Sequence, residues 1–285
     1  MNFGLELSNE FQKFTNGIFE SEVQLFTKLQ DAFISIASRN RFRGAIDVIH
    51  GAKSFVNFEL NASYISTLPI GSEWKRELAD MLFIVFSTQK TPEIRLMYMQ
   101  NKKGANHSKF VADLLQLHLL KDRKEITSNP LPKCVFGNPK ILSAAVLASV
   151  GSYGVFYQDD CKKIEMAYYP AGNLEPCNLK GGELRTVCFN KDIQFGSKCT
   201  IQRYVENQGE QTLENFVNAL VRMEVGTPIL KDPAIHKLVQ FLYSNSSVFR
   251  ESYSLLELEI EPEQDFWEDM PFTCVINADL MSEMD

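Results

Sequence analysis

Residues 77–103 read ELADMLFIVFSTQKTPEIRLMYMQNKK, and this stretch decides the expected fold. Two apolar runs, residues 81–86 and 94–99, are separated by a short polar segment that contains Pro92. Continuous apolar runs of this length are typical of strands buried in a sheet. We therefore predict two adjacent strands, over residues 79–86 and 94–101, joined by a loop.

Polar residues stand at one end of each predicted strand. Asp80 opens the first apolar run, whereas Gln100 and Lys102 follow the second. Gln100 and Lys102 are two positions apart, so they project from the same face of a strand. Carboxylate and amide oxygens suit Mg²⁺, and an ammonium group can orient a water or stabilise a pentacovalent phosphate. The stretch thus predicts an acid, an amide and an ammonium at one edge of a sheet, as metal-dependent phosphodiester hydrolysis requires.

The segments around this stretch predict further elements. Residues 16–38 are expected to form an amphipathic helix, with Glu22 on its apolar stripe. A basic loop with Arg39, Arg41 and Arg43 follows, and then short strands over residues 45–50 and 54–60. Gly104 is expected to end the second strand of the central stretch. A helix capped by Asn106 or Ser108 is then expected to run to about residue 121.

The remainder of the chain gives weaker signals. We predict a short helix over residues 139–149, a hairpin of residues 151–158 and 163–169, and short strands at 185–189 and 199–205. Helices are expected over residues 211–225, ending at Gly226, and from Pro233 to residue 244. Residues 256–261 alternate Leu or Ile with Glu, which predicts a strand with one buried face.

The order E-L-x-D, apolar strand, loop, Arg, apolar strand and Q-x-K-K resembles the PD-(D/E)XK nuclease superfamily. The resemblance covers residues 16–125, extends less specifically to Tyr169, and is silent on residues 170–285. It implies an α/β protein with a restriction-endonuclease-like mixed sheet flanked by helices. Residues 1–170 would be the nuclease core. Residues 171–285 would be an α+β elaboration for specificity or partner contacts, either separate from the core or compact with it.

The resemblance also implies roles for individual residues. Asp80 matches the first metal-binding acid of the family, and Lys102 matches the catalytic lysine. Gln100 stands where the family normally has a second acid, so this chain is a Q-x-K variant. Glu22 on the preceding helix, or Glu77, would then supply a compensating carboxylate. The implied cofactor is Mg²⁺ or Mn²⁺, held by Asp80, Gln100 and Glu22.

Four basic residues are candidates for nucleic-acid contacts: Lys103, Lys109, Arg41 and Arg43. Lys109 falls in the first turn of a predicted helix, where the helix dipole disfavours a cation unless a phosphate is near. Arg41 and Arg43 belong to the basic loop, which is either a backbone contact or a solvated loop. Lys103 projects to the opposite face from Lys102, and a solvated charge is the simpler interpretation.

Composition sets the broad class. The chain has 285 residues with 45% apolar residues, which suffices for a core without disulfides. Six widely spaced cysteines lack metal-site spacing and indicate reduced thiols. No apolar run long enough to span a membrane and no secretory signal is present, so we expect a cytoplasmic protein. Net charge is −7, but residues 1–125 carry 16 basic and 14 acidic residues, so the negative charge lies in the C-terminal part.

The function expected from these observations is a divalent-metal-dependent endonuclease that hydrolyses DNA, in restriction or anti-phage defence. RNA as the target stays open, and a homodimer is implied by the resemblance. The alternative is a catalytically quiet nuclease-fold subunit that binds or assembles in a defence complex. The acidic segment 257–269, with Phe266 and Trp267, is either a solvated surface or a docking surface for a partner protein.

Overall fold

The computed structural model describes residues 2–60, 71–89, 92–106, 109–174, 176–177, 186–190, 212–229, 234–253 and 270–283. The strands expected at 199–205 and 256–261 lie outside these residues, as does the acidic segment 257–269. The chain is an α/β protein with a mixed central sheet flanked by helices. This confirms the coarse fold class predicted from the sequence.

Ten described strands form the main sheet. Its continuous path runs β1, β12, β4, β5, β6, β10 and β9, while β7 and β11 also pair with β5, and β8 pairs with β7. The strands are β1 (Ile46–Ile49), β4 (Met81–Ser87), β5 (Glu93–Asn106), β6 (Lys109–Asp113), β7 (Gly151–Gln158), β8 (Ile164–Pro170), β9 (Pro176–Cys177), β10 (Thr186–Asn190), β11 (Thr227–Pro228) and β12 (Phe272–Asn277). A separate small sheet pairs β2 (Phe55–Glu59) with β3 (Glu73–Glu77).

The central pair β4 and β5 is antiparallel, with Met81 opposite Met99. The predicted strands are therefore present, but the second is longer than expected. β5 continues through Gly104 to Asn106, with an irregularity between these two residues, because it pairs in parallel with β7 beyond Met99. Since β4 begins only at Met81, the segment of β5 from Gln100 onward has no β4 neighbour. That open edge positions the site described below.

Strand β12 lies between β1 and β4, antiparallel to the first and parallel to the second. All six of its residues are buried. Residues from the N-terminal core segment and from the C-terminal segment thus build one sheet. This strand was not predicted from the sequence.

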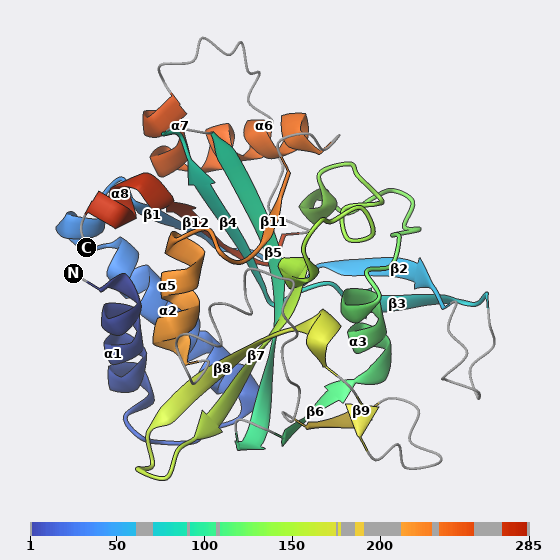
Figure 1. Cartoon of the computed structure of the whole chain (residues 1–285), viewed down its shortest axis with the longest axis horizontal. Helices are drawn as coiled ribbons and strands as arrows, with labels where there is room; N and C mark the ends of the chain where they lie inside the picture. The colour runs from blue at the N-terminus through green and yellow to red at the C-terminus, as the bar shows by residue number, and fades with distance from the viewer. Residues whose placement is uncertain are drawn as a thin grey trace.

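Helices cover both faces of the sheet (Figure 1). One core contains side chains of α1 (Phe3–Thr15), α2 (Glu22–Ala37), α5 (Leu213–Val221) and α8 (Ala278–Glu283). The opposite core contains side chains of α3 (Leu114–Lys121), α6 (Ile235–Asn245) and α7 (Ser247–Tyr253). Along β4, Leu82, Ile84 and Phe86 face the α3 core, whereas Met81, Phe83 and Val85 face the α2 core. Strand alternation therefore divides the apolar run between two layers.

The predicted helix over residues 16–38 is shorter, and α1 precedes it. Helix α1 ends at Thr15 because Asn16 and Gly17 adopt left-handed backbone conformations. Helix α2 begins at Glu22 because Ser21 and Gln24 form a reciprocal capping box. The predicted helix wrongly included the turn that separates α1 from α2.

The helix predicted from Asn106 or Ser108 to residue 121 was wrong in its first half. Residues 109–113 form strand β6, which pairs with β5 and β10. Helix α3 begins only at Leu114, where the Asp113 side chain accepts a hydrogen bond from the Gln116 backbone N–H. Lys109 accordingly lies in a strand and not in the first turn of a helix.

The predicted hairpin is present as β7 and β8, and the strand expected at 185–189 is present as β10. The helix predicted over residues 211–225 is present over a shorter range as α5, and the one predicted from Pro233 is present as α6. The helix predicted at 139–149 is absent: that segment, which is fully described, consists mainly of turns and bends with a short 3₁₀ turn, Ala148–Val150. Among the described residues, no helix combines the length and apolar character needed to cross a membrane.

Candidate functional site

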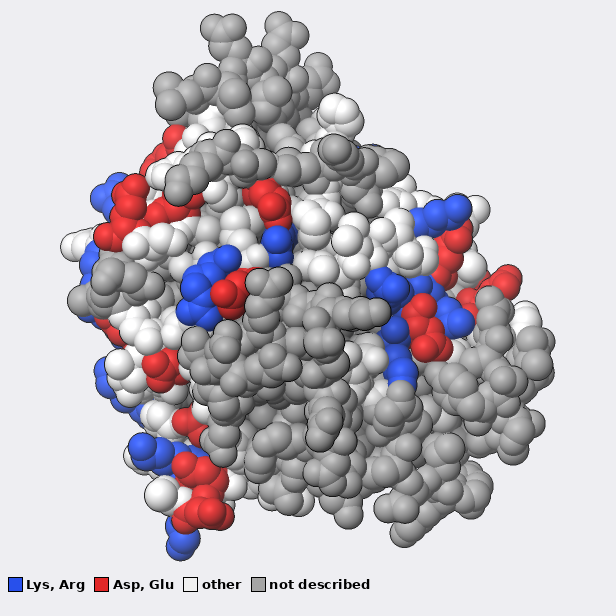
Figure 2. Space-filling view, viewed as in Figure 1, with Lys and Arg blue, Asp and Glu red and all other residues white. Residues whose placement is uncertain are grey.

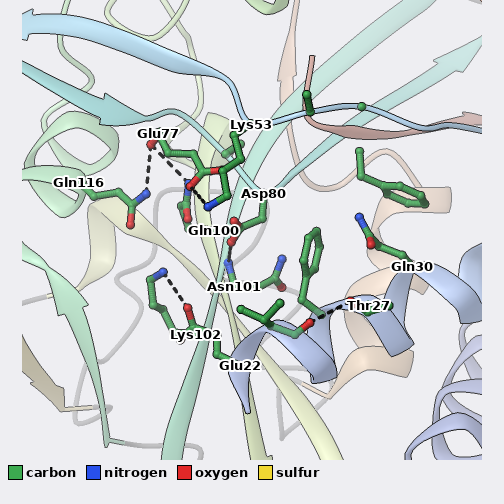
Figure 3. A pocket seen from close by; sticks show the side chains of 16 residues that line it. Glu22, Thr27, Gln30, Lys53, Glu77, Asp80, Gln100, Asn101, Lys102 and Gln116 are labelled. Atoms are coloured by element: carbon green, nitrogen blue, oxygen red, sulfur yellow. Dashed lines mark hydrogen bonds and ion pairs between the residues drawn. The ribbon is translucent and has the colours of Figure 1, made fainter. Parts of the chain in front are cut away.

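A pocket of about 410 Å³ lies where β4 and β12 begin and where β5 loses its β4 neighbour. Helix α2 and the residues after β1 form one side, and β3 and α3 contribute to the other (Figure 3). Its lining includes Glu22, Val23, Phe26, Thr27, Gln30, Gly51, Ala52, Lys53, Glu77, Ala79, Asp80, Gln100, Asn101, Lys102, Gln116 and Phe272. The pocket therefore contains every residue predicted to be catalytic or to bind metal.

Asp80 lies directly before β4 and reaches the open edge of β5. Its backbone N–H donates to the Met99 carbonyl, which extends the sheet pairing by one residue. Its Oδ2 accepts a hydrogen bond of 2.6 Å from the Asn101 backbone N–H. The carboxylate thus occupies the place of a missing β4 carbonyl.

Glu22 accepts in the same way from the next N–H group on this edge of β5, two residues further along the strand. Its Oε2 accepts a 3.0 Å hydrogen bond from the Lys103 backbone N–H, and its Oε1 lies 3.3 Å from Lys102 Nζ. The side chain stands at the first residue of α2, where the helix dipole favours a negative charge. Two carboxylates from different elements therefore satisfy the exposed N–H groups of β5 and hold Lys102 toward the pocket (Figure 3).

Gln100 projects from the α3 face of β5. One terminal atom of its amide lies 3.1 Å from Asp80 Oδ2, and the other lies 2.8 Å from Gln116 Nε2. When the nitrogen faces Asp80, the amide donates to the carboxylate and its oxygen accepts from Gln116. When the amide is turned over, its oxygen faces the Asp80 oxygen. Gln116 also donates to the Glu77 carbonyl at 3.0 Å, which fixes its position.

The pKa of Asp80 is raised from 3.8 to about 6, chiefly by burial and also by the nearby charges of Glu77 and Glu22. The Lys102 ammonium and the Asn101 N–H act in the opposite direction. The carboxylate is thus held in a place where its negative charge is poorly compensated. A cation at this position would relieve that imbalance.

The donor set fits Mg²⁺ bound by few protein ligands. Asp80 offers a carboxylate oxygen, and Gln100 in its turned orientation offers an amide oxygen beside it. Mg²⁺ commonly uses one or two carboxylates and keeps several waters. Within the described residues no group of three His, Cys, Asp or Glu side chains is arranged to hold a metal ion. A metal site here would therefore include the Gln100 amide, and the roles of Gln100 and Glu22 as ligands stay predictions.

Glu77 lies on the pocket wall, where its Oε2 is 3.2 Å from Lys53 Nζ. The Lys53 side chain is 73% exposed, so the pair contributes little to stability. Glu77 thus adds negative charge near Asp80. In one orientation of the Gln100 amide, Nε2 also donates to the Glu77 backbone carbonyl at 3.4 Å. A role for Glu77 in catalysis stays a prediction.

The residues predicted to contact nucleic acid are dispersed. Lys103 Nζ donates to the carbonyls of Phe19 and Glu20 and lies 4.0 Å above the Phe19 ring, so it is not a simple solvated charge. Arg41 pairs with Glu6 beyond the far end of α2. Helix α2 has 16 residues, so its ends are about 24 Å apart. Arg41 and its neighbour Arg43 are accordingly remote from Glu22 and the pocket, while the Lys109 side chain is outside the described residues.

Lys53, Gln116 and Asn101 are among the pocket residues that sequence reasoning missed. Lys53 and Gln116 come from segments distant in sequence, and no local pattern marks them. Asn101 had a signal, because it lies between Gln100 and Lys102. Strand alternation places it on the face opposite to Gln100 and Lys102.

Charges on the face shown in Figure 2 are interspersed: among its described residues, Lys and Arg side chains lie beside Asp and Glu and do not form one continuous basic patch. Comparisons of the chain with protein-family models, with curated proteins and with solved structures found no match in any of the three. The functional argument therefore depends on the geometry of the pocket.

Proposed function

We propose that this chain is a divalent-metal-dependent endonuclease that hydrolyses phosphodiester bonds of DNA, with a PD-(D/E)XK-like core. One observation carries the proposal: Asp80, Gln100 and Lys102 meet in a single pocket, at the open edge of β5. The order α2, β4, β5, α3 and β7 also agrees with the helices and strands that the sequence resemblance requires. Mg²⁺ or Mn²⁺ is the proposed cofactor.

Each residue of the proposed site has a distinct task. Asp80 and Gln100 would hold the cation, which when bound supplies charge neutralisation and an activated water. Lys102 would orient the water or stabilise the negative charge that develops on the phosphate. Because its ammonium is held by Glu22 at 3.3 Å, Lys102 is directed before the substrate arrives. Glu22 is thus proposed as a positioning residue whose carboxylate also adds negative charge to the site.

Restriction or defence against foreign DNA is the proposed biological setting, and it rests on the resemblance alone. A homodimer would allow both strands of a duplex to be cut. RNA is the competing substrate, because nothing in the pocket distinguishes the two sugars.

The proposal is tested by incubating plasmid DNA with wild type, Asp80→Ala and Lys102→Ala in the presence of Mg²⁺ or Mn²⁺. Nicking or linearisation by wild type and its loss in both variants would support the proposal. Equal cleavage by all three proteins would show that the activity comes from elsewhere. A structured RNA in parallel reactions identifies the preferred nucleic acid.

A second candidate is a nuclease-fold subunit that binds nucleic acid or a partner protein without cutting. The neutral Gln100 in place of an acid favours it, as does the engagement of both Glu22 oxygens with β5 residues. DNA binding by wild type without cleavage at any Mg²⁺ or Mn²⁺ concentration would favour this candidate over the endonuclease.

A further inference from the structure

Beyond Glu22, the α2 side of the pocket carries six uncharged residues that have no task in the proposed hydrolysis. They are Val23, Phe26, Thr27 and Gln30 on α2, Phe272 at the start of β12, and Asn101 on β5. We call these six residues the α2 wall. None of them is charged, whereas the opposite side carries Glu77, Asp80 and Lys102. The pocket therefore combines charged residues suited to a phosphate with a neutral wall suited to an uncharged group.

Asn101 carries the main observation on the α2 wall. The residue is 1% exposed, and neither its Nδ2 nor its Oδ1 has a hydrogen-bond partner in the part of the chain that the structure describes. Its backbone N–H is taken by Asp80, but its side-chain amide is left unpaired. Buried polar groups without partners are rare in native proteins and are often retained for a function.

Gly154 shows that the fold makes room for this amide. In the parallel pairing of β5 with β7, Gly154 is the partner of Asn101. A Cβ atom added at Gly154 would lie 2.8 Å from Asn101 Oδ1 and 2.9 Å from Met166 Sδ. Glycine weakens the interior of a strand and often marks a close approach. Here the close approach is that of the unpaired amide.

We propose that the α2 wall is a nucleobase-binding subsite, in which the Asn101 amide pairs with the edge of an unpaired base. The inference rests on the proposed nuclease function, because the α2 wall and Lys102 line the same pocket. A carboxamide presents a donor beside an acceptor, which matches the donor–acceptor edge of a base such as adenine. Phe26, which is partly buried, offers an aromatic surface on which a base can stack.

The size and polarity of the pocket agree with this ligand. Its volume of about 410 Å³ falls within the range of small-molecule sites. A nucleotide bound with its phosphate toward Lys102 and its base toward Asn101 would use both sides. The consequence is a preference for a nucleotide that is unpaired or can leave the duplex, beside the phosphate that is cut.

The test compares the four deoxynucleoside monophosphates with 2-deoxyribose 5-phosphate, which has the phosphate and sugar but no base. Affinities are measured by calorimetry in Ca²⁺, and the Asn101 side-chain amide is followed by NMR. We expect at least one nucleotide to bind about tenfold more tightly than the base-free sugar phosphate, with a shift of the Asn101 amide signal. Asn101→Leu should abolish this advantage and leave the affinity for the sugar phosphate unchanged.

Two further variants separate recognition from folding. Asn138→Leu is a matched control: Asn138 is 6% exposed, but its amide oxygen accepts from the Lys140 N–H at 2.9 Å. It should lower the melting temperature and keep the base preference, whereas Asn101→Leu should keep or raise the melting temperature. Phe26→Leu keeps the wall apolar but removes the ring, and should weaken nucleotide binding about fivefold to tenfold.

Equal affinity of wild type for all four nucleotides and for the sugar phosphate would overturn the subsite. So would an Asn101→Leu protein that retains the base preference. These outcomes are distinct from failure of the proposed function. DNA cleavage without any base preference would support the nuclease and contradict the subsite. A base preference that depends on Asn101, in a protein that cannot cleave DNA, would support the subsite and contradict the nuclease.

Discussion

The Lys102 ammonium lies 3.3 Å from the Glu22 carboxylate, although the two residues are 80 positions apart in the sequence. The contact exists because β5 extends past the first residue of β4 and leaves its N–H groups without a strand neighbour. Asp80 accepts from the first of these groups and Glu22 from the second. The features that complete the sheet edge are therefore the same ones that assemble the candidate site.

Replacing Lys102 by Met should lower the rate of DNA cleavage by about 10²–10³-fold, the usual effect of losing one group that stabilises the transition state. Met keeps the length of the aliphatic chain, so the fold should be preserved. Single-turnover cleavage at saturating Mg²⁺ measures the effect. Lys75→Met is the control, because Lys75 is exposed on β3 and is not part of the pocket lining. Unchanged cleavage by Lys102→Met would contradict the assigned role.

Glu22→Gln tests the positioning role separately. The amide can still accept from the Lys103 N–H but no longer attracts the Lys102 ammonium by charge. We expect cleavage to fall by about tenfold, less than with Lys102→Met, because the ammonium remains but is less well directed. An equal loss in the two variants would instead indicate that Glu22 takes part in metal binding, and a Mg²⁺ titration of the variant distinguishes these cases.

Metal binding should depend on pH through Asp80. Its pKa is raised to about 6, so below that pH the carboxyl is protonated and a cation must displace the proton. The Mg²⁺ affinity is expected to rise by up to about tenfold per pH unit as pH increases toward 6, and to level off above it. Calorimetric titrations between pH 5 and 8 measure this. Asp80→Asn should bind weakly at every pH, and a wild-type affinity that does not change with pH would exclude Asp80 as the ligand.

The sequence predicted the central part of the site because its signals are local. Strand alternation places Gln100 and Lys102 on one face, and the apolar runs identify β4 and β5 regardless of the remaining fold. The helical stripe similarly placed Glu22 on α2. These assignments depend on spacings of a few residues, which the sequence displays directly.

The parts of the fold and of the site that the sequence did not predict depend on contacts between distant segments. Strand β12 has six buried residues and enters the sheet beside β4, but its short apolar run resembles any buried segment. The residues after Gly104 were assigned to a helix because Asn106, Ser108 and the following apolar residues look like a helix start. Pairing of β6 with β10 overrides that local preference. Gln116 and Lys53 enter the pocket only through such tertiary contacts.

Gly51→Ala should destabilise the protein by about 3 kcal/mol, the upper range for forcing extra atoms into a packed site. A Cβ at Gly51 would lie 2.1 Å from the Met270 carbonyl oxygen and 2.4 Å from that of Pro271, so the backbone leading into β12 would have to move. Gly71→Ala is the matched control: Gly71 has φ +80 but no atom within 4 Å of an added Cβ. It should cost only about 1–2 kcal/mol, from the left-handed backbone alone. Urea denaturation measures both, and equal losses would contradict the close approach at Gly51.

Glu165 on β8 should make the stability of the fold depend on pH. Its Oε1 accepts from Gln12 Nε2 at 3.2 Å, whereas its Oε2 is buried without a hydrogen-bond partner among the described residues. Its pKa is raised from 4.5 to about 7, chiefly by burial and also by the charges of Asp159 and Glu214. Between these two pH values the folded protein keeps a proton that the unfolded chain has released.

The free energy of unfolding should therefore fall as pH rises from about 4.5 to about 7 through this group, by at most about 1.4 kcal/mol per pH unit. Glu165→Gln keeps the shape and the hydrogen bond to Gln12 but cannot ionise, so it should lack this component. Urea denaturation of both proteins at pH 5, 6 and 7 isolates the effect as the difference between them, because every other titrating group is shared. The variant should gain stability over wild type as pH rises, and curves that stay parallel would show that the Glu165 carboxyl titrates normally in the folded protein.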